Sequence, residues 1–331
     1  MRRGPTWRAG GRSAISLLLG LIALATVCTS VTVPASSAAT MPRWTTSYYE
    51  GNARVPVLFH QGAMAGRAGA QGIVILDFGR PATRAGVDGT IDFSGAFLPF
   101  AAIAAGARSF VHGYYRDAPR STSMFVAIGT NNSCGTGQPC GSVLCGCVDE
   151  PASFLAWGEQ LAAVVKEDAA WTIALRRAHA YTDDVQVVAA DDIEPAFDPG
   201  FLNTDDVLAG YAAAVGGTSP AMVDYGSADP HFWPEEHLYQ VAYGFPPDVP
   251  MPEIYDARQA REWATLLRYA RQRGRTVTIF GVLSEPALGE PPASAYGELL
   301  RAITGITAQQ KIPWLSAIAP LHGARLAQEA R

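Results

Sequence analysis

The chain has 331 residues, 48% of them hydrophobic, and a formal net charge of −5 at pH 7. An acidic chain is poorly suited to bind nucleic acid or an anionic membrane surface, because both repel negative charge. The hydrophobic content is sufficient for one sizeable core, and the length allows one large domain or two small ones.

Residues 1–39 are expected to be an export signal that is removed from the folded protein. Arg2 and Arg3 begin a basic segment, an apolar run follows over residues 14–28, and Ser37-Ala38-Ala39 is typical of a cleavage site. The apolar run is short for a membrane span, and no later segment has the length for one. We therefore expect a secreted protein with one domain over residues 40–331. The alternative is that the signal is retained as an N-terminal anchor.

Strand-like segments alternate with helical ones along the rest of the chain, which is typical of parallel α/β architecture. Strands are expected at residues 72–78, 109–115, 124–129, 185–190, 221–225, 252–255, 276–282 and 312–318. Helices are expected at residues 97–106, 154–177, 234–244 and after Asp256, which is a suitable N-cap. Eight strands in one domain predict an α/β protein with a (β/α)8, or TIM, barrel, and residues 40–70 are expected to wrap its bottom or form a lid. A doubly wound open sheet is the alternative, but no G-x-G-x-x-G follows the first strand.

Four cysteines lie close together in the loop after the third predicted strand, at Cys134, Cys140, Cys145 and Cys147. In an exported protein such a cluster predicts two disulfides that pin the loop. Cys145 and Cys147 are too close in sequence to be good partners, which leaves 134–145 with 140–147, or 134–147 with 140–145. A zinc site with four thiolates is the alternative, although its usual paired C-x-x-C pattern is absent.

The fourth predicted strand ends in Asp191-Asp192-Ile193-Glu194-Pro195, where carboxylates follow a continuous apolar run. Catalytic groups of (β/α)8 barrels lie at the C-terminal ends of the strands. Side chains alternate along a strand, so Asp192 and Glu194 are expected on the same side. Like charges this close raise the pKa of one acid, which can then donate a proton while its neighbour stays ionised.

Further polar side chains are expected at the ends of the other strands: Asp77, Tyr114, Asn131, Asp224, Tyr225, Tyr255 and Glu285. Such a rim suits a sugar, because carboxylates catalyse, amides and acids bind hydroxyl groups, and aromatic rings stack on the apolar face. The alternative for any one acid is that it caps a helix or pairs with an arginine such as Arg80 or Arg116.

Other catalytic classes lack their motifs. The six histidines are scattered without H-x-H or H-E-x-x-H, and neither G-x-S-x-G nor a P-loop is present. Disulfides in the cysteine loop would leave no free thiol there as a nucleophile. We therefore expect neither a cofactor nor a bound metal.

Two short motifs resemble those of known glycoside hydrolases. Ile75-Leu76-Asp77 on the first predicted strand and Asp192-Ile193-Glu194 on the fourth resemble the muramidase-type enzymes, and also the secreted actinobacterial barrels described as glycoside-hydrolase-like. The resemblance implies that Glu194 donates the proton, while Asp192 and Asp77 stabilise positive charge or polarise a neighbouring group. The Trp-Gln-Tyr pattern that muramidases carry near strand seven is missing from this chain.

A second resemblance is to the retaining glycosidases whose acid/base and nucleophile lie at the ends of strands four and seven. Glu194-Pro195 and Glu285 occupy those positions here, with Ile193 where those enzymes usually carry Asn. The sequence thus predicts a barrel that acts on a cell-wall or extracellular polysaccharide, with Glu194 as general acid and Asp192, Asp77 or Glu285 as the second carboxylate. The alternatives are a non-catalytic carbohydrate-binding barrel at the cell surface and a structural or partner-binding barrel.

Overall fold

The computed structural model describes residues 41–119, 121–133, 149–275 and 277–320. The predicted export signal and the four-cysteine loop, with its predicted disulfides, lie outside the described residues. Within the described part, no helix combines the length and the apolar character needed to cross a membrane.

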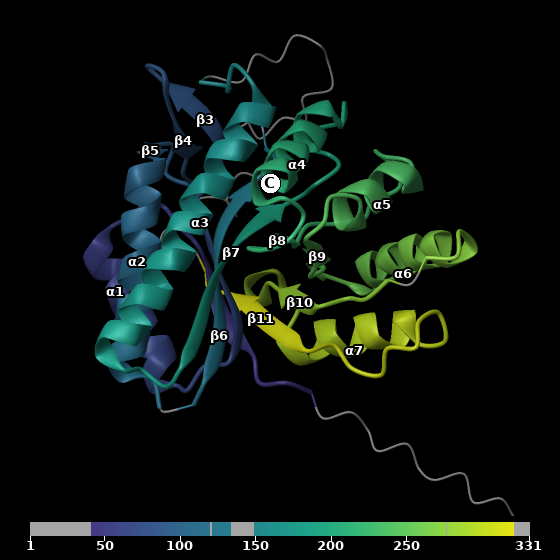
Figure 1. The fold of residues 1–331 in the computed structure, drawn as a ribbon. Coiled ribbons are helices and arrows are strands. Elements are labelled where there is room, and N and C mark those ends of the chain that lie inside the picture. Colours follow the sequence, from purple (N-terminus) through teal and green to yellow (C-terminus); the bar gives the residue numbers. More distant parts are fainter. Residues whose placement is uncertain (1–40, 120, 134–148, 276, 321–331) are drawn as a thin grey trace, which may run out of the picture. The chain divides into compact units, whose positions relative to one another are not determined.

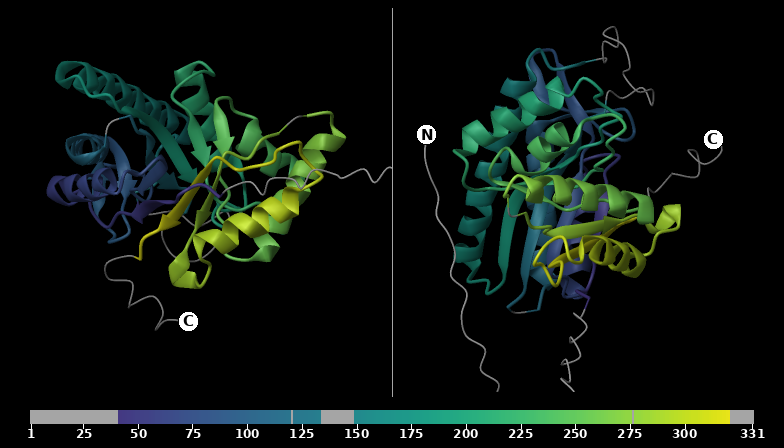
Figure 2. Two further views of the ribbon diagram at one scale, coloured as in Figure 1. Left: turned by 90° about the horizontal axis from the view of Figure 1, so that it is seen from below. Right: turned by 90° about the vertical axis from the view of Figure 1, so that its right-hand side faces the viewer.

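Eight parallel strands form a nearly closed barrel with helices outside it (Figures 1 and 2). Around the sheet, the strands are β10 (Gly281–Ser284), β11 (Trp314–Ile318), β1 (Thr45–Tyr49), β2 (Gly72–Asp77), β6 (Ser123–Asn131), β7 (Asp184–Asp192), β8 (Met222–Asp224) and β9 (Asp248–Pro250). The architecture agrees with the predicted α/β barrel.

The barrel closes between the segment after β9 and strand β10. Glu253 forms an isolated parallel bridge with Leu283. The Ile254 N–H donates to the Leu283 carbonyl at 2.9 Å, and the Leu283 N–H donates to the Pro252 carbonyl at 2.9 Å. We call this junction the seam, because it replaces the regular strand pairing found elsewhere in the ring.

In the described part, a helix follows each of the first seven barrel strands. The helices are α1 (Val55–Arg67), α2 (Phe100–Asp117), α3 (Phe154–His179), α4 (Leu202–Val215), α5 (Glu235–Tyr243), α6 (Ala257–Gln272) and α7 (Pro292–Ile303), with a short 3-10 turn η1 (Pro286–Leu288) before α7. The predicted start of α6 is confirmed, since the Asp256 carboxylate accepts hydrogen bonds from the N–H groups of Arg258 and Gln259.

The core has two parts, which the alternation of side chains along the strands separates. On β7, Val188 and Ala190 belong to the cluster inside the barrel. Val187 and Ala189 belong to the larger cluster between the strands and the helices. Both faces of β7 are therefore covered, as its continuous apolar run predicts.

A small antiparallel sheet that was not predicted lies between β2 and α2. It contains β3 (Arg80–Arg84), β4 (Val87–Ile91) and β5 (Phe97–Pro99). The Thr90 hydroxyl donates to the Phe78 carbonyl at 2.6 Å and so fixes β4 beside the end of β2. Gly79 has a φ of +90°, and a Cβ there would collide with the Ile91 carbonyl oxygen. This close approach requires glycine.

The prediction of a strand over residues 109–115 is wrong, because the segment is the second half of α2. Phe110, Val111 and Tyr114 are buried at helical spacing. Gly113 allows α2 to approach α1 so closely that a Cβ would meet the Phe59 carbonyl. Strand β1 and helix α1 instead occupy the region expected to wrap the barrel, so the predicted number of barrel strands is right although this one was misplaced. The strand predicted at residues 252–255 is also wrong, because β9 ends at Pro250 before that segment begins. β10 begins at Gly281, later than the start predicted at residue 276.

Candidate active site

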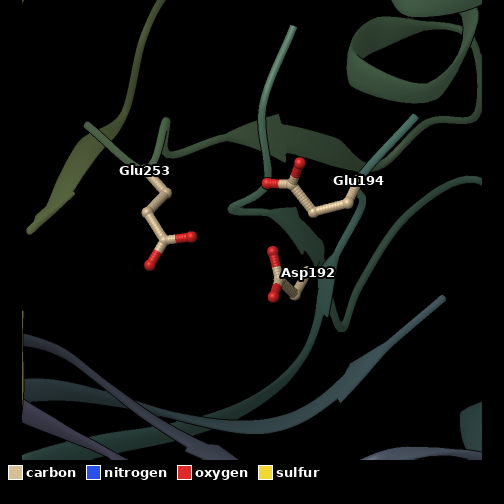
Figure 3. Close-up of side chains that lie close together, drawn as sticks. All are labelled: Asp192, Glu194 and Glu253. Atoms are coloured by element: carbon tan, nitrogen blue, oxygen red, sulfur yellow. The ribbon is translucent and has the colours of Figure 1, made fainter. Parts of the chain in front are cut away.

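Three carboxylates converge at the C-terminal end of the barrel, and we call them the acid trio: Asp192, Glu194 and Glu253 (Figure 3). Asp192 ends β7, Glu194 follows two residues later, and Glu253 stands at the seam. One oxygen of each side chain lies within 4.8 Å of the others. The predicted proximity of Asp192 and Glu194 is therefore confirmed, and Glu253 joins them from another strand end.

Glu194 is held by groups from two neighbouring loops. Its N–H donates to the Asn132 side-chain oxygen at 3.0 Å, and the Asn132 amide donates back to the Glu194 carbonyl at 3.2 Å. The Ser227 hydroxyl donates to the Glu194 carboxylate at 2.6 Å. These bonds fix both the backbone and the carboxylate, so Glu194 is well positioned before any ligand binds.

Glu253 lies between two tyrosines and is 1% exposed. The Tyr49 hydroxyl donates to its carboxylate at 3.3 Å. The Tyr255 hydroxyl lies close enough to Glu253 and to Glu285, which follows β10, to lower the pKa of either carboxyl group as a hydrogen-bond donor. The predicted residues Tyr255 and Glu285 thus reach the acid trio through Glu253.

A second buried carboxylate network involves the predicted residues Asp77, Tyr225 and Asn131. The Tyr225 hydroxyl donates to Asp77 at 2.7 Å, and the Gly79 N–H donates to the other oxygen of Asp77 at 2.7 Å. The Asn131 side chain is also hydrogen-bonded to Asp77. Asp77 is 1% exposed, so these donors replace water around its carboxylate. It lies close enough to raise the pKa of Asp192 by charge repulsion.

The pKa values at the site are raised, chiefly by burial. Burial raises the pKa of Glu194 to about 7, although the Ser227 hydrogen bond acts in the opposite direction. The pKa values of Asp192 and Glu253 lie well above the ordinary range, because both side chains are buried and face other carboxylates. No ion pair between described residues includes a member of the trio. The trio therefore retains protons at a pH where exposed acids are ionised.

Two predicted site residues are not brought to the acid trio. The Asp224 carboxylate accepts a hydrogen bond from the Gly226 N–H at 3.2 Å, and alternation along the chain places it on the opposite side from Tyr225. Tyr114 lies on helix α2, where its hydroxyl donates to the Ala70 carbonyl at 2.8 Å and is also hydrogen-bonded to the Thr122 hydroxyl at 2.7 Å. Its assignment to a strand end was wrong for the same reason as the strand itself.

Three contributors were missed in the sequence: Glu253, Tyr49 and Ser227. The sequence does contain an indication of Glu253. It stands two residues before the predicted site residue Tyr255, and in an extended chain side chains two residues apart point to the same side. Tyr49 lay in the segment expected to wrap the barrel. No comparable pattern marks Ser227, whose role follows from the approach of the loop after β8 to Glu194.

The acid trio is also the group of described side chains that could hold a metal ion. Ca²⁺ binds oxygens at about 2.3–2.6 Å, so ligands on opposite sides of it lie about 4.6–5.2 Å apart. Asp192 Oδ1 is buried and has no hydrogen-bond partner among the described residues, which leaves it able to accept a proton or a cation.

The chain has no match among protein-family models, and no curated protein matches it. The fold and the acid trio are therefore the basis for assigning a function.

Proposed function

We propose that the protein is a secreted glycoside hydrolase that acts on a cell-wall or extracellular polysaccharide. The observation that supports this function best is the convergence of Asp192, Glu194 and Glu253 at the C-terminal ends of the barrel strands, with no cationic partner among the described residues. Glycosidic bonds are cleaved by pairs of carboxylic acids, one of which is protonated. Residues 1–39 serve as the export signal in this proposal.

Glu194 is the general acid. A pKa of about 7 keeps a substantial fraction of its carboxyl groups protonated near neutral pH, where proton transfer by such a group is efficient. Its proton passes to the glycosidic oxygen as the bond between that oxygen and the anomeric carbon breaks. The leaving sugar thus departs as a neutral alcohol.

Glu253 is the second carboxylate in place of Asp77 or Glu285. Burial raises the pKa of Glu253, and the hydroxyls of Tyr49 and Tyr255 oppose that rise by favouring the ionised carboxylate. Glu253 acts as the nucleophile in the molecules in which it has lost its proton. Oxygens within 4.8 Å fit the spacing of about 5–5.5 Å in retaining enzymes better than the 6.5–9.5 Å of inverting ones. Glu253 therefore bonds to the anomeric carbon, and Glu194 then takes a proton from the water that releases the sugar.

Asp192 lies beside both of these carboxylates and supplies negative charge when it is ionised. It stabilises the positive charge that develops on the sugar ring as the leaving group departs. Its unpartnered oxygen, Oδ1, is available for a hydrogen bond to a sugar hydroxyl when Asp192 is ionised.

The test is the release of reducing ends from a panel of peptidoglycan, chitin, β-glucan and arabinogalactan. Glu194→Gln should lower turnover by about 10²–10⁴-fold, the usual contribution of a general acid. Glu159→Gln is the matched control, because Glu159 is an exposed side chain on α3. Unchanged turnover in Glu194→Gln would remove Glu194 from the mechanism. Glycan affinity without any turnover of the wild-type protein would favour a carbohydrate-binding barrel.

A second candidate function is cation binding at the same carboxylates, which the unpartnered Asp192 Oδ1 favours. Calorimetric titration with CaCl₂ and MnCl₂, with Asp192→Asn as the control, tests it. A cation that binds the wild-type protein but not Asp192→Asn, together with turnover that EDTA abolishes, would favour a metal-dependent reaction. Turnover that is unaffected by EDTA would favour acid catalysis by the trio.

A further inference from the structure

An aromatic side chain next to the acid trio is held outside the core. Phe93 lies in the turn between β4 and β5 and is 40% exposed. Its ring packs on Tyr49, with centroids 4.8 Å apart and planes tilted by 39°. The hydroxyl of that tyrosine donates to Glu253 at 3.3 Å. The Tyr49 ring therefore lies between Phe93 and Glu253, the carboxylate proposed to attack the sugar.

The turn that carries Phe93 is rigid, because Asp92 binds most of its polar groups. One carboxylate oxygen of Asp92 accepts hydrogen bonds from the Ser94 N–H at 2.8 Å, the Ser94 hydroxyl at 2.7 Å and the Ala96 N–H at 2.9 Å. The Asp92 N–H also donates to the Ala96 carbonyl at 2.9 Å. Asp92 itself is only 4% exposed. The turn is therefore anchored, and Phe93 is presented to solvent with little freedom to fold into the core.

The surroundings of this aromatic pair suit a ligand with both apolar and hydroxyl-rich faces. A pyranose ring has an apolar face of C–H groups that stacks on an aromatic ring, while its edge carries hydroxyls. The acceptors for those hydroxyls are the carboxylates of the acid trio, and Tyr49 supplies a further polar group at the boundary. A purely apolar ligand would leave these polar groups without partners.

We propose that Phe93 and Tyr49 form a stacking subsite for one pyranose ring of a glycan, next to the sugar unit at the acid trio. The inference rests on the proposed function, because it assigns the ring that binds beside the reacting sugar. Phe93 contributes affinity and position, and it takes no part in the transfer of protons.

Binding should be measured in a Glu194→Gln background, so that turnover does not consume the ligand. The probes are the hexamers of N-acetylglucosamine and of glucose, and solubilised peptidoglycan, titrated by calorimetry. Adding Phe93→Ala should weaken binding of the preferred probe by about tenfold, within the range for an aromatic contact. Phe93→Leu should behave in the same way and controls for folding, since it keeps apolar volume, whereas Phe93→Trp should retain affinity.

Phe232→Ala is the matched control, because Phe232 resembles Phe93 in exposure and in ring packing. It is 43% exposed, and its ring centroid lies 5.5 Å from that of His231. It should leave affinity within about twofold, as expected for a surface substitution. Equal affinities of the Phe93→Ala and Phe232→Ala variants would overturn the subsite and leave the hydrolase proposal standing. Loss of affinity in Phe93→Ala, with no turnover by the wild-type protein, would support the subsite and remove the hydrolase. No affinity of the wild-type protein for any of the three probes would overturn the subsite.

Discussion

Two of the regions in which this barrel buries carboxylates differ in what surrounds the charge. Between α2 and α3, Asp168 is fully buried and receives a hydrogen bond from the Arg108 guanidinium at 2.7 Å. Arg108 also pairs with Glu167 at 2.7 Å and lies over the Trp171 ring. In the acid trio, buried carboxylates instead face other carboxylates, tyrosines and Ser227. Burial is common to both regions, and only the first supplies a compensating cation.

This difference separates a structural acid from a chemically active one. Burial raises the pKa of Asp168 to about 6 while Arg108 opposes the shift, and the pair links two helices. In the trio no ion pair with a described residue opposes burial, so the carboxyl groups keep their protons to a higher pH, as the proposed proton transfer requires. The feature that sets the trio apart from Asp168 is the convergence of three carboxylates with no ion pair to a described residue.

The largest expected effect is on catalysis by Glu253. Glu253→Gln should lower turnover on the preferred glycan by about 10³-fold or more, because the attacking carboxylate is lost. Its free energy of unfolding should stay equal to that of the wild-type protein or rise by about 1 kcal/mol, since the variant replaces a buried carboxyl group whose ionised form is disfavoured beside other carboxylates. Initial rates and urea denaturation measure the two effects. A strongly destabilised variant with normal turnover would assign Glu253 to the structural class.

Arg108→Met should show the opposite pattern. It should lower the free energy of unfolding by about 3 kcal/mol, because it leaves Asp168 buried without its cation. Turnover per folded molecule should be unchanged, since Arg108 is remote from the trio. Urea denaturation with activity measured at low denaturant checks both statements. A double variant with Asp168→Asn should recover part of the stability, and a failure to do so would contradict the pairing.

Stability should also depend on pH through Glu194, whose pKa rises on folding from 4.5 to about 7. Below about pH 4.5 both states are protonated, whereas between pH 4.5 and 7 only the folded state retains the proton. The free energy of unfolding should therefore fall as the pH rises through this window, by up to about 1.4 kcal/mol per pH unit for one proton. Urea denaturation at four pH values should give a shallower slope for Glu194→Gln. Identical slopes would show that Glu194 titrates at its ordinary pKa.

Tyr49→Phe should have the smallest effect. It removes one hydroxyl donor to Glu253 and should lower kcat/KM by about fivefold, in line with about 1 kcal/mol for a hydrogen bond. The pKa of Glu253 should rise, so the acidic limb of the pH–rate profile should move to higher pH. An unchanged acidic limb would show that the Tyr49 hydroxyl does not affect the pKa of Glu253. Tyr49 would then contribute only by packing against Phe93.

The sequence identifies the parts of the barrel whose local pattern agrees with their tertiary role. Strand β7 has a continuous apolar run, and helix α6 has an N-cap and an amphipathic stripe. Both elements were predicted. The second half of α2 was not, because Ser109–Tyr115 carries β-branched and aromatic residues whose helical state depends on packing against α1 at Gly113. Glu194 and Asp192 followed from alternation within one strand. Glu253 depends on how β9 lies relative to β7, which is a long-range property of the fold.

The position of Glu253 at the seam has a consequence for how the ring and its ligand influence each other. The seam is held by a bridge and a few backbone hydrogen bonds, and Glu285, directly after β10, lies close to Tyr255, which also approaches Glu253. A glycan that contacts both flanks binds only the closed ring and therefore shifts the equilibrium against opening. Backbone amide exchange at Ile254 and Leu283 thus reports ligand occupancy. If the proposed glycan binds there, its binding free energy should add to the free energy that keeps the barrel closed at the seam.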